Sequence, residues 1–203
     1  ADLALESEAA LAYTLRVARA LDSQHLEHER LLARLATPVG KYMICKAAPP
    51  LVNEAQECLG GAGFVEESIM ARLFRQSPLN SIWEGSGNVM GLDVLRAMGR
   101  EAEAIPAVME ELEQARGNHP NLDRAIDDLR DELADPEGLE ARMRMVTEMM
   151  ALTLQAALLT RHGDSPVADA FCASRLAPRY RGAFGTLPKG LDLDAIISRA
   201  LPG

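Results

Sequence analysis

The residue most suited to chemistry in this sequence is Glu84, which lies in the stretch Ser81–Met90, SIWEGSGNVM. It follows Trp83, the only tryptophan of the chain, and precedes the turn-forming Gly85. A carboxylate that apolar neighbours partly shield from water holds a proton more strongly and can act as a general base. The alternative is a solvated loop acid that interacts favourably with the start of the next helix. Taken alone, the stretch favours this alternative.

A second candidate stretch contains Gly60, Gly61 and Gly63, where the segment EAQECLGGAGF ends an apolar helical pattern. Glycine lets another backbone or a ligand approach closely. Consecutive exposed N–H groups in such a turn can bind an anion such as a phosphate. The simpler interpretation is a glycine-rich helix stop, which is favoured when this stretch is considered by itself.

The order and spacing of the two stretches are more specific than either one. An acid precedes a Gly-Gly pair, and a Gly-aromatic pair, an acid, two arginines and an aromatic-Glu-Gly-Ser segment follow. The members are Glu57, Gly60, Gly61, Gly63, Phe64, Glu67, Arg72, Arg75 and Ile82–Ser86. This pattern resembles the C-terminal helical domain of the flavin-dependent acyl-CoA dehydrogenases. The segment IWEGSGNVMGLDVLR further resembles the AidB-like branch of that family, which is associated with alkylation damage and carries an extra C-terminal helical layer.

The resemblance implies a role for each matched residue. Glu84 would be the catalytic base of an oxidoreductase that desaturates an acyl-CoA thioester between Cα and Cβ. The α-proton would go to Glu84 while the β-hydrogen leaves as hydride to FAD. The residues that would contact this FAD are Glu57, Gly60, Gly61, Ser86 and Asn88. Glu57 departs from the family, which usually has an amide there, and a carboxylate beside a pyrophosphate is unfavourable unless it is protonated or paired.

The resemblance also implies what surrounds this sequence. Related enzymes have a helical domain and a β domain before the matched region. We therefore expect a C-terminal fragment of a longer flavoprotein, which would be inactive alone and would not hold FAD stably. Family members are commonly homotetramers through this domain, so acyl-CoA and further copies of the chain are the expected partners. The second function class is a DNA-associated AidB-like protein with minor dehydrogenase activity.

The DNA-associated alternative would need cations at the surface. The net charge of −9 argues against binding nucleic acid over the whole surface. Fourteen acids stand against five bases between Glu101 and Glu148, so arginines have many carboxylates to pair with, and we favour such pairing. The candidates for double-stranded DNA contacts are Arg96, Arg100, Arg175, Arg179 and Arg181.

Helical periodicity and a composition rich in Ala, Leu and Met predict an all-α fold. One helix is expected over residues 3–35 with a frayed middle at 22–29. A second is expected to start at Thr37–Pro38 and to reach Leu59 with a kink at Pro49–Pro50. Residues 81–84 are expected to be extended. Further helices are expected at about 66–74, from about 88 to 98, and at 120–134, 137–161, 166–176 and 192–201.

Two parts are expected along the chain. Residues 1–103 would belong to the C-terminal helical bundle of the acyl-CoA dehydrogenases. Residues 104–203 would form the extra helical region of the AidB-like branch. The junction between them is itself helical, so the boundary is soft.

Several site classes are not expected. The three cysteines, Cys45, Cys58 and Cys172, are widely spaced, which indicates reduced thiols of a cytoplasmic protein rather than disulfides or a zinc site. His25 and His28 have the spacing of a metal pair but no third ligand, so no metal is expected. No apolar run approaches the roughly 20 residues that span a bilayer.

Overall fold

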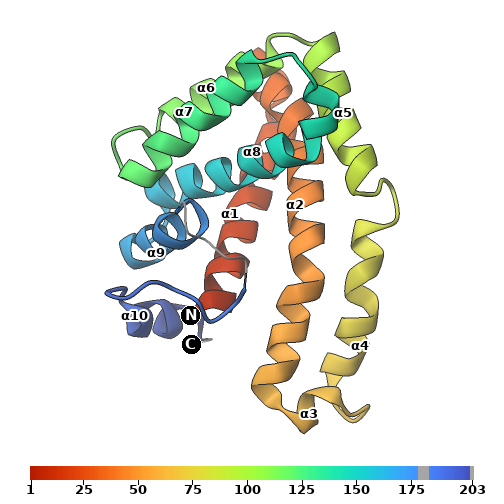
Figure 1. Cartoon of the computed structure of the whole chain (residues 1–203), viewed down its shortest axis with the longest axis vertical. Helices are drawn as coiled ribbons and strands as arrows, with labels where there is room; N and C mark the ends of the chain where they lie inside the picture. Colours follow the sequence, from red (N-terminus) through yellow and green to blue (C-terminus); the bar gives the residue numbers. More distant parts are fainter. Residues whose placement is uncertain (178–182, 202–203) are drawn as a thin grey trace.

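The computed structural model describes residues 1–177 and 183–201, and all regular secondary structure in these ranges is helical (Figure 1). The all-α prediction is therefore confirmed. The elements are α1 Asp2–Asp22, α2 Glu27–Leu59, α3 Gly61–Phe64, α4 Ile69–Gln76, the 3-10 helix η1 Ser77–Ser81, α5 Gly87–Arg100, α6 Ala104–Glu113, α7 Pro120–Ala134, α8 Leu139–His162, α9 Ser165–Arg175 and α10 Leu193–Ala200.

The long helix α2 begins at Glu27, so the predicted helix start at Thr37–Pro38 is wrong. The Thr37 hydroxyl donates a hydrogen bond to the carbonyl oxygen of Ala33 (2.7 Å), as a threonine inside a helix does. Pro38 has no N–H and removes one helical hydrogen bond. The helix continues through it because neighbouring side chains such as Leu35, which is fully buried, pack into the core.

The core fills one end of the molecule, which we call the body: α1, residues 27–42 of α2, and α5 to α10. Helix α8 runs through it and contacts α1, α2, α5, α6, α7 and α9 (Figure 1). Leu5 and Leu35 from the first expected part share one apolar cluster with Leu112 and Leu154 from the second. The division near residue 103 stays a prediction, and it does not separate two cores.

A buried ionic cluster fastens α6 and α8 to the first two helices of the body. The Arg16 guanidinium of α1 donates from Nη1 to Glu29 (2.7 Å) and from Nε to Glu111 (2.8 Å). Arg161 of α8 reaches Glu111 as well (3.1 Å). Only 9% of the Arg16 side chain and 4% of the Glu111 side chain are exposed, so each charge needs the others.

The remaining elements form a hairpin that extends away from the body, and we call it the arm: residues 43–59 of α2, α3, α4 and η1 (Figure 1). No residue of α2 beyond Tyr42 is buried. On α4, Ile69 and Leu73 lie one turn apart, and 61% and 43% of their surfaces are exposed. The arm is therefore a pair of helices with an apolar surface that the described part of the chain does not cover.

The arm returns to the body through residues 81–86. The predicted extended segment at 81–84 is wrong, because η1 reaches Ser81 and a turn follows over Ile82–Glu84. The N–H groups of Ile82 and Trp83 both donate to the carbonyl oxygen of Leu79, at 2.9 and 3.1 Å. These bonds continue the helical path of η1 up to the residue before Glu84.

Candidate active site

Glu84 has a backbone conformation that few side chains adopt. Its φ is +52°, and it is the one non-glycine residue with a positive φ in the described part of the chain. The next residue, Gly85, has a φ of +118°. A left-handed conformation costs an L-residue about 1–2 kcal/mol. Such strain persists where the surroundings hold it, and it is often found at functional sites.

The side chain of Lys41, on α2, holds the backbone around Glu84. Its Nζ donates to the carbonyl oxygen of Trp83 (2.9 Å) and to the carbonyl oxygen of Gly85. Hydrogen bonds from a charged donor are stronger than those between neutral groups. The loop is therefore attached to a helix of the body by a single ammonium group.

Glu84 borders a pocket of about 490 Å³ between α2, α5 and the end of α1. Arg30, Arg34 and Lys41 supply three cations to its lining, and Asp93 supplies a second carboxylate. Apolar portions come from Leu21, Ala33, Pro38 and Met90. The pocket thus has Glu84 in its lining, a wall of three cations, which we call the cationic wall, and apolar portions that suit an acyl chain.

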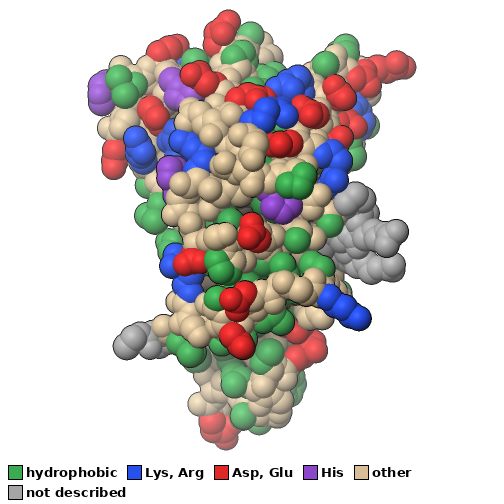
Figure 2. Space-filling model, turned by 90° about the vertical axis from the view of Figure 1, so that its left-hand side faces the viewer, with side chains coloured by type: hydrophobic (Ala, Val, Ile, Leu, Met, Phe, Trp, Pro, Cys, Tyr) green, Lys and Arg blue, Asp and Glu red, His purple; other side chains and the backbone are tan. Residues whose placement is uncertain are grey.

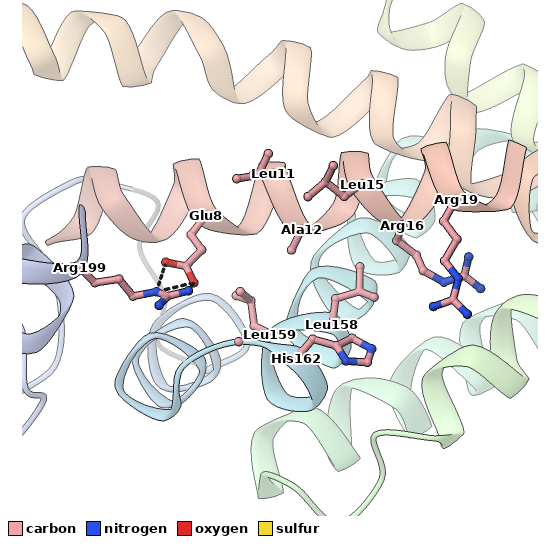
Figure 3. Close-up of a pocket in the computed structure, with 11 residues that line it drawn as sticks. Glu8, Leu11, Ala12, Leu15, Arg16, Arg19, Leu158, Leu159, His162 and Arg199 are labelled. Carbon is pink, nitrogen blue, oxygen red and sulfur yellow. Dashed lines mark hydrogen bonds and ion pairs between the residues drawn. The ribbon is translucent and has the colours of Figure 1, made fainter. Parts of the chain in front are cut away.

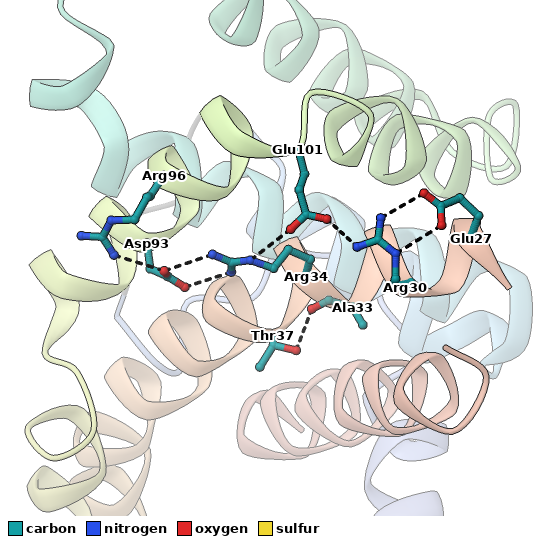
Figure 4. A network of polar contacts seen from close by, with 8 residues as sticks. All are labelled: Glu27, Arg30, Ala33, Arg34, Thr37, Asp93, Arg96 and Glu101. Carbon is teal, nitrogen blue, oxygen red and sulfur yellow. Dashed lines mark hydrogen bonds and ion pairs between the residues drawn. The ribbon is translucent and has the colours of Figure 1, made fainter. Parts of the chain in front are cut away.

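A chain of ion pairs fixes the cationic wall of this pocket (Figure 4). Arg34 forms paired hydrogen bonds with Asp93 of α5 (3.1 and 3.2 Å). Arg30 contacts Glu27 (2.9 Å) and Glu101 (2.5 Å). These pairs hold α5, which follows the Glu84 loop, against α2.

Ser86 and Asn88, predicted as cofactor contacts, lie at the start of α5. Ser86 occupies the N-cap position, but its side chain makes no capping hydrogen bond. The Asn88 side-chain oxygen accepts from Nη1 of Arg144 (3.3 Å), and the Arg144 guanidinium lies 5.8 Å from the centre of the Tyr42 ring. Because the Ser86 side chain does not cap α5, the first N–H groups of this helix can donate hydrogen bonds to an anion.

Gly60 and Gly61 form the corner at the tip of the arm. Gly60 has a φ of +59°, and no heavy atom lies within 4 Å of the Cβ position of either glycine. Gly63 is required by close packing, because a Cβ there would lie 2.6 Å from the carbonyl oxygen of Gln56. Glu57 is exposed and its Oε1 accepts a hydrogen bond from Asn53 (2.9 Å). The backbone of Gly60 and Gly61 is therefore accessible to a ligand or to another protein chain.

The predicted site residues fall into two groups that the fold keeps apart. Glu84, Ser86 and Asn88 lie where the arm meets the body, whereas Glu57 and the Gly60–Gly61 corner lie at the far end of the arm (Figure 1). The order and spacing of the two stretches gave no information on this separation. One chain therefore does not gather all five expected cofactor contacts around one point.

Two site residues were missed at the level of sequence: Lys41 and Arg34. Each is a cation on an amphipathic helix, and nothing in the surrounding sequence marks it. Their role comes from the approach of α5 and the Glu84 loop to α2, which is a tertiary contact. A helical-wheel argument places them on the same face, but it does not say what that face meets.

Of the five arginines considered for DNA, Arg175 is removed by the structure. Its side chain is 2% exposed and pairs with Asp2 and with Glu6 (2.8 Å), so a phosphate cannot reach it. Arg96 is exposed and pairs with Asp93 (3.3 Å). Arg100 is exposed at the end of α5, and Arg179 and Arg181 lie outside the described residues.

The surface charge pattern agrees with pairing rather than a phosphate track. Figure 2 shows acidic and basic side chains interspersed over the face that it presents. Continuous positive potential is what binds a nucleic-acid backbone. Where this face is described, acidic side chains lie among the basic ones.

The structure also bears on metal binding and on the thiol of Cys172. No group of three or more His, Cys, Asp or Glu side chains there could hold a metal ion. His28 instead lies near Glu110 (3.4 Å). Burial raises the pKa of the Cys172 thiol to about 12, which keeps it protonated and unreactive. No helix in the described ranges is long and apolar enough to cross a membrane.

A second pocket, of about 370 Å³, lies between α1 and the end of α8 (Figure 3). Its walls are mainly apolar, with Leu11 and Leu15 facing Leu158 and Leu159. A Glu8–Arg199 ion pair (2.9 Å) lies at one end. This pocket contains none of the predicted site residues, and the chemistry is concentrated at Glu84.

Comparison with known proteins places this geometry among relatives. Residues 1–99 match the family model "Acyl-CoA dehydrogenase, C-terminal domain". The chain is 40% identical over 177 residues to AidB of Escherichia coli (strain K12), covering 87% of this chain and 32% of the relative. It is 31% identical over 130 residues to acyl-CoA dehydrogenase family member 11 of Caenorhabditis elegans, covering 64% of this chain and 20% of that relative.

Solved structures agree with the sequence matches. The crystal structure of Caenorhabditis elegans ACDH-11 in complex with C11-CoA superposes with a TM-score of 0.76 at 26% identity, over 83% of this chain and 34% of that one. The structure called Bd2924 apo-form gives a TM-score of 0.69 at 26% identity, over 77% and 31%. The chain spans about a third or less of the length of each of these relatives. The 177-residue match also extends well beyond residue 99.

Proposed function

We propose that this chain supplies the catalytic base of an FAD-dependent acyl-CoA dehydrogenase. The chain belongs to the acyl-CoA dehydrogenase family, and its residues 1–99 match the C-terminal domain of that family. The complete enzyme would also contain the flavin-binding and acyl-binding parts that longer relatives have. Its substrate would be an acyl-CoA thioester.

The observation that supports this function most directly is the strained Glu84 loop at the edge of a cationic pocket. In the proposed reaction the Glu84 carboxylate accepts the proton from Cα of the acyl group, and the C–H electron pair becomes the new Cα–Cβ double bond. The β-hydrogen departs with its own electron pair. FAD, when bound, supplies the two-electron acceptor that no side chain of this sequence can provide.

The residues of this chain fit a dinucleotide cofactor at two places. The Gly60–Gly61 corner is open, so a flavin dinucleotide can approach its backbone without meeting a side chain. The start of α5 offers N–H groups beside Ser86, and Asn88 adds a side-chain amide. Glu57 does not fit this group in the same way, because its hydrogen bond from the neutral side chain of Asn53 leaves the carboxylate charge in place.

The separation of the two groups suggests how copies of the chain share cofactors. If copies of the chain assemble, the Gly60–Gly61 corner at the tip of the arm and Glu84 at its root would contact two different FAD molecules. The exposed apolar side chains of the arm, among them Phe64 at 80% and Ile69 at 61% exposure, provide surface for such an assembly. We accordingly propose a homotetramer in which each tip contacts the FAD held mainly by a neighbouring copy.

The decisive experiment is the Glu84→Gln substitution in the complete flavoprotein. Acyl-CoA oxidation measured with an artificial electron acceptor should fall by about 10²-fold or more, because loss of a general base costs about that much. Glu103→Gln is the matched control, since Glu103 is also an exposed loop glutamate but lies away from the pocket. Turnover retained by Glu84→Gln would overturn the proposed function.

A second experiment concerns the chain by itself. Most contacts to the flavin are proposed to come from outside residues 1–203, so purified chain should carry no flavin. An absorbance spectrum of the purified protein, compared with its protein concentration, checks this. A flavin band near one equivalent per chain would contradict the proposed division of the binding site.

A further inference from the structure

The loop that carries Glu84 has few backbone hydrogen bonds of its own. Ile82 and Trp83 donate to Leu79, and the next backbone bond outside the helices is from Met90 to Ser86 (2.9 Å). Between these, within the described ranges, the contacts that fix the peptide groups come from Lys41. The two residues that it brackets, Glu84 and Gly85, both have a positive φ.

We propose that Lys41 is the positioning residue of the catalytic base, an inference that rests on the proposed role of Glu84. Its ammonium group joins the carbonyl oxygen before Glu84 to the carbonyl oxygen of Gly85. Peptide groups are planar, so fixing these two carbonyls leaves the intervening residues little freedom to rotate. The direction of the Glu84 Cα–Cβ bond then follows from the clamp.

The clamp is effective because Lys41 stands on a rigid part of α2. Its neighbour Gly40 is packed so closely that a Cβ there would lie 2.4 Å from the Tyr13 ring. The Tyr13 hydroxyl in turn donates to the carbonyl oxygen of Ala36 (2.8 Å). Lys41 therefore connects the tightly packed α1–α2 contact to the loop of residues 81–86.

Lys41 and Glu84 also border the same pocket. A change at Lys41 that only weakened the fold would lower the amount of active enzyme without a specific kinetic pattern. A change that lets Glu84 turn away from the substrate lowers kcat and leaves KM nearly unchanged, because substrate binding does not depend on the base. A direct contact of Lys41 with the substrate would raise KM instead.

The kinetic test uses the complete flavoprotein with Lys41→Met, Lys41→Arg and Lys189→Met. Lys41→Met keeps the length of the side chain and removes the donors, so kcat should fall by about 10- to 100-fold, as a misplaced catalytic group does, with KM changed by less than about twofold. Lys41→Arg keeps donors and charge and should give a kcat between those of the wild type and Lys41→Met. Lys189 is an exposed lysine in the turn before α10 and does not line the pocket that Glu84 borders, so Lys189→Met should match the wild type.

A spectroscopic test needs no activity and uses the chain itself. Trp83 is the only tryptophan, and its own carbonyl accepts the Lys41 bond. Lys41→Met should increase quenching of its fluorescence by acrylamide and lower its emission anisotropy, whereas Lys189→Met should change neither. Far-UV circular dichroism of the variants shows whether the helices remain intact.

The outcomes separate the two proposals. Unchanged Trp83 fluorescence and unchanged kcat in Lys41→Met, with Glu84→Gln inactive, would overturn the positioning role and leave the proposed function standing. A rise in KM with kcat preserved would overturn it in favour of a substrate contact. Full turnover in Glu84→Gln would overturn both proposals, since no base would remain to be positioned.

Discussion

The two halves of α2 are continuous in backbone but opposite in surroundings. Between Glu27 and Tyr42 the helix buries nine residues, among them Leu32, Leu35 and Val39, against α1 and the helices of the second half of the chain. From residue 43 to residue 59 it buries none; Met43 and Ile44 still pack against the edge of the core, and the rest of this half lies along the arm. The first half is held by its own chain, whereas the second stays largely uncovered by the described part of the chain.

The difference explains where the candidate site lies. Catalytic groups need rigid support, and the body supplies it through Lys41 and the paired Arg34. Cofactor contacts on an open arm can instead be completed by another molecule. Glu84 is placed at the junction, where a strained loop of the arm is tied to the rigid half of α2.

The largest expected effect that separates the two regions concerns ion pairs. Arg16→Met removes the partner of half-buried Glu29 and leaves buried Glu111 with Arg161 alone, so the free energy of unfolding should fall by about 3 kcal/mol. Arg75→Met in the arm breaks an exposed pair with Glu66 and should have no measurable effect. Urea denaturation followed by circular dichroism compares the two, and equal losses would remove the distinction between body and arm.

A smaller contrast is expected for leucine side chains. Leu35 is fully buried, whereas Leu73 on α4 is 43% exposed. Leu35→Ala should lower the free energy of unfolding by about 3 kcal/mol through lost burial and a cavity. Leu73→Ala should stay within about 0.5 kcal/mol in the isolated chain. If Leu73→Ala proves as costly as Leu35→Ala, the apolar face of the arm is covered within the chain itself.

The dependence of stability on pH should arise in the body. Burial alone would raise the pKa of Glu111, but the guanidinium groups of Arg16 and Arg161 outweigh it and hold the pKa below its ordinary value of 4.5. A lowered pKa in the folded state means that this stabilisation is present above about pH 4.5 and is lost as the pH falls through the folded value. Denaturation curves recorded down to acidic pH measure this loss. Arg16→Met should flatten the dependence, while Arg75→Met should leave its slope unchanged.

The smallest effect is expected at the junction. Glu84→Gly removes the side chain that disfavours the positive φ, so it should raise the free energy of unfolding by at most about 1 kcal/mol, the strain relieved being partly offset by the greater freedom of glycine in the unfolded chain. Glu84→Ala keeps the strain and serves as the control. The same denaturation measurement applies, and a clear loss of stability in Glu84→Gly would show that the carboxylate holds the loop.

Sequence patterns predicted the elements whose signals are local. The helix at 120–134 has Pro120 at its first position and ends at Asp135 before Pro136, and the structure places α7 at the same residues. Periodic apolar residues likewise located α8 and α9 within a few positions. The helix start predicted at Thr37–Pro38 was wrong because that signal depends only on neighbouring residues. The helix continues through Pro38 because of packing against residues distant in the sequence.

The site could be predicted only in part for the same reason. The glycines and the Glu84 turn are recognisable because backbone geometry demands particular residue types. Lys41 has no such signature, and its importance depends on a carbonyl contact with a loop 42 residues later in the chain. Arg175 is the opposite case. It belongs to a cluster of arginines in the sequence and was therefore predicted to be at the surface, but the fold buries its side chain against Asp2 and Glu6.

The continuity of α2 also makes it a lever. From residue 43 to residue 59 the helix extends roughly 25 Å beyond the body at 1.5 Å per residue. A tilt of about 5° at its root therefore moves the Gly60–Gly61 corner by about 2 Å, while the Lys41 side of the pivot hardly shifts. Pro49 and Pro50 lie within this lever, at points where helical hydrogen bonds are missing and bending is easiest. Small adjustments in the packing of the body are thus magnified at the tip, far from Glu84, which lies beside the root of the helix's outer half.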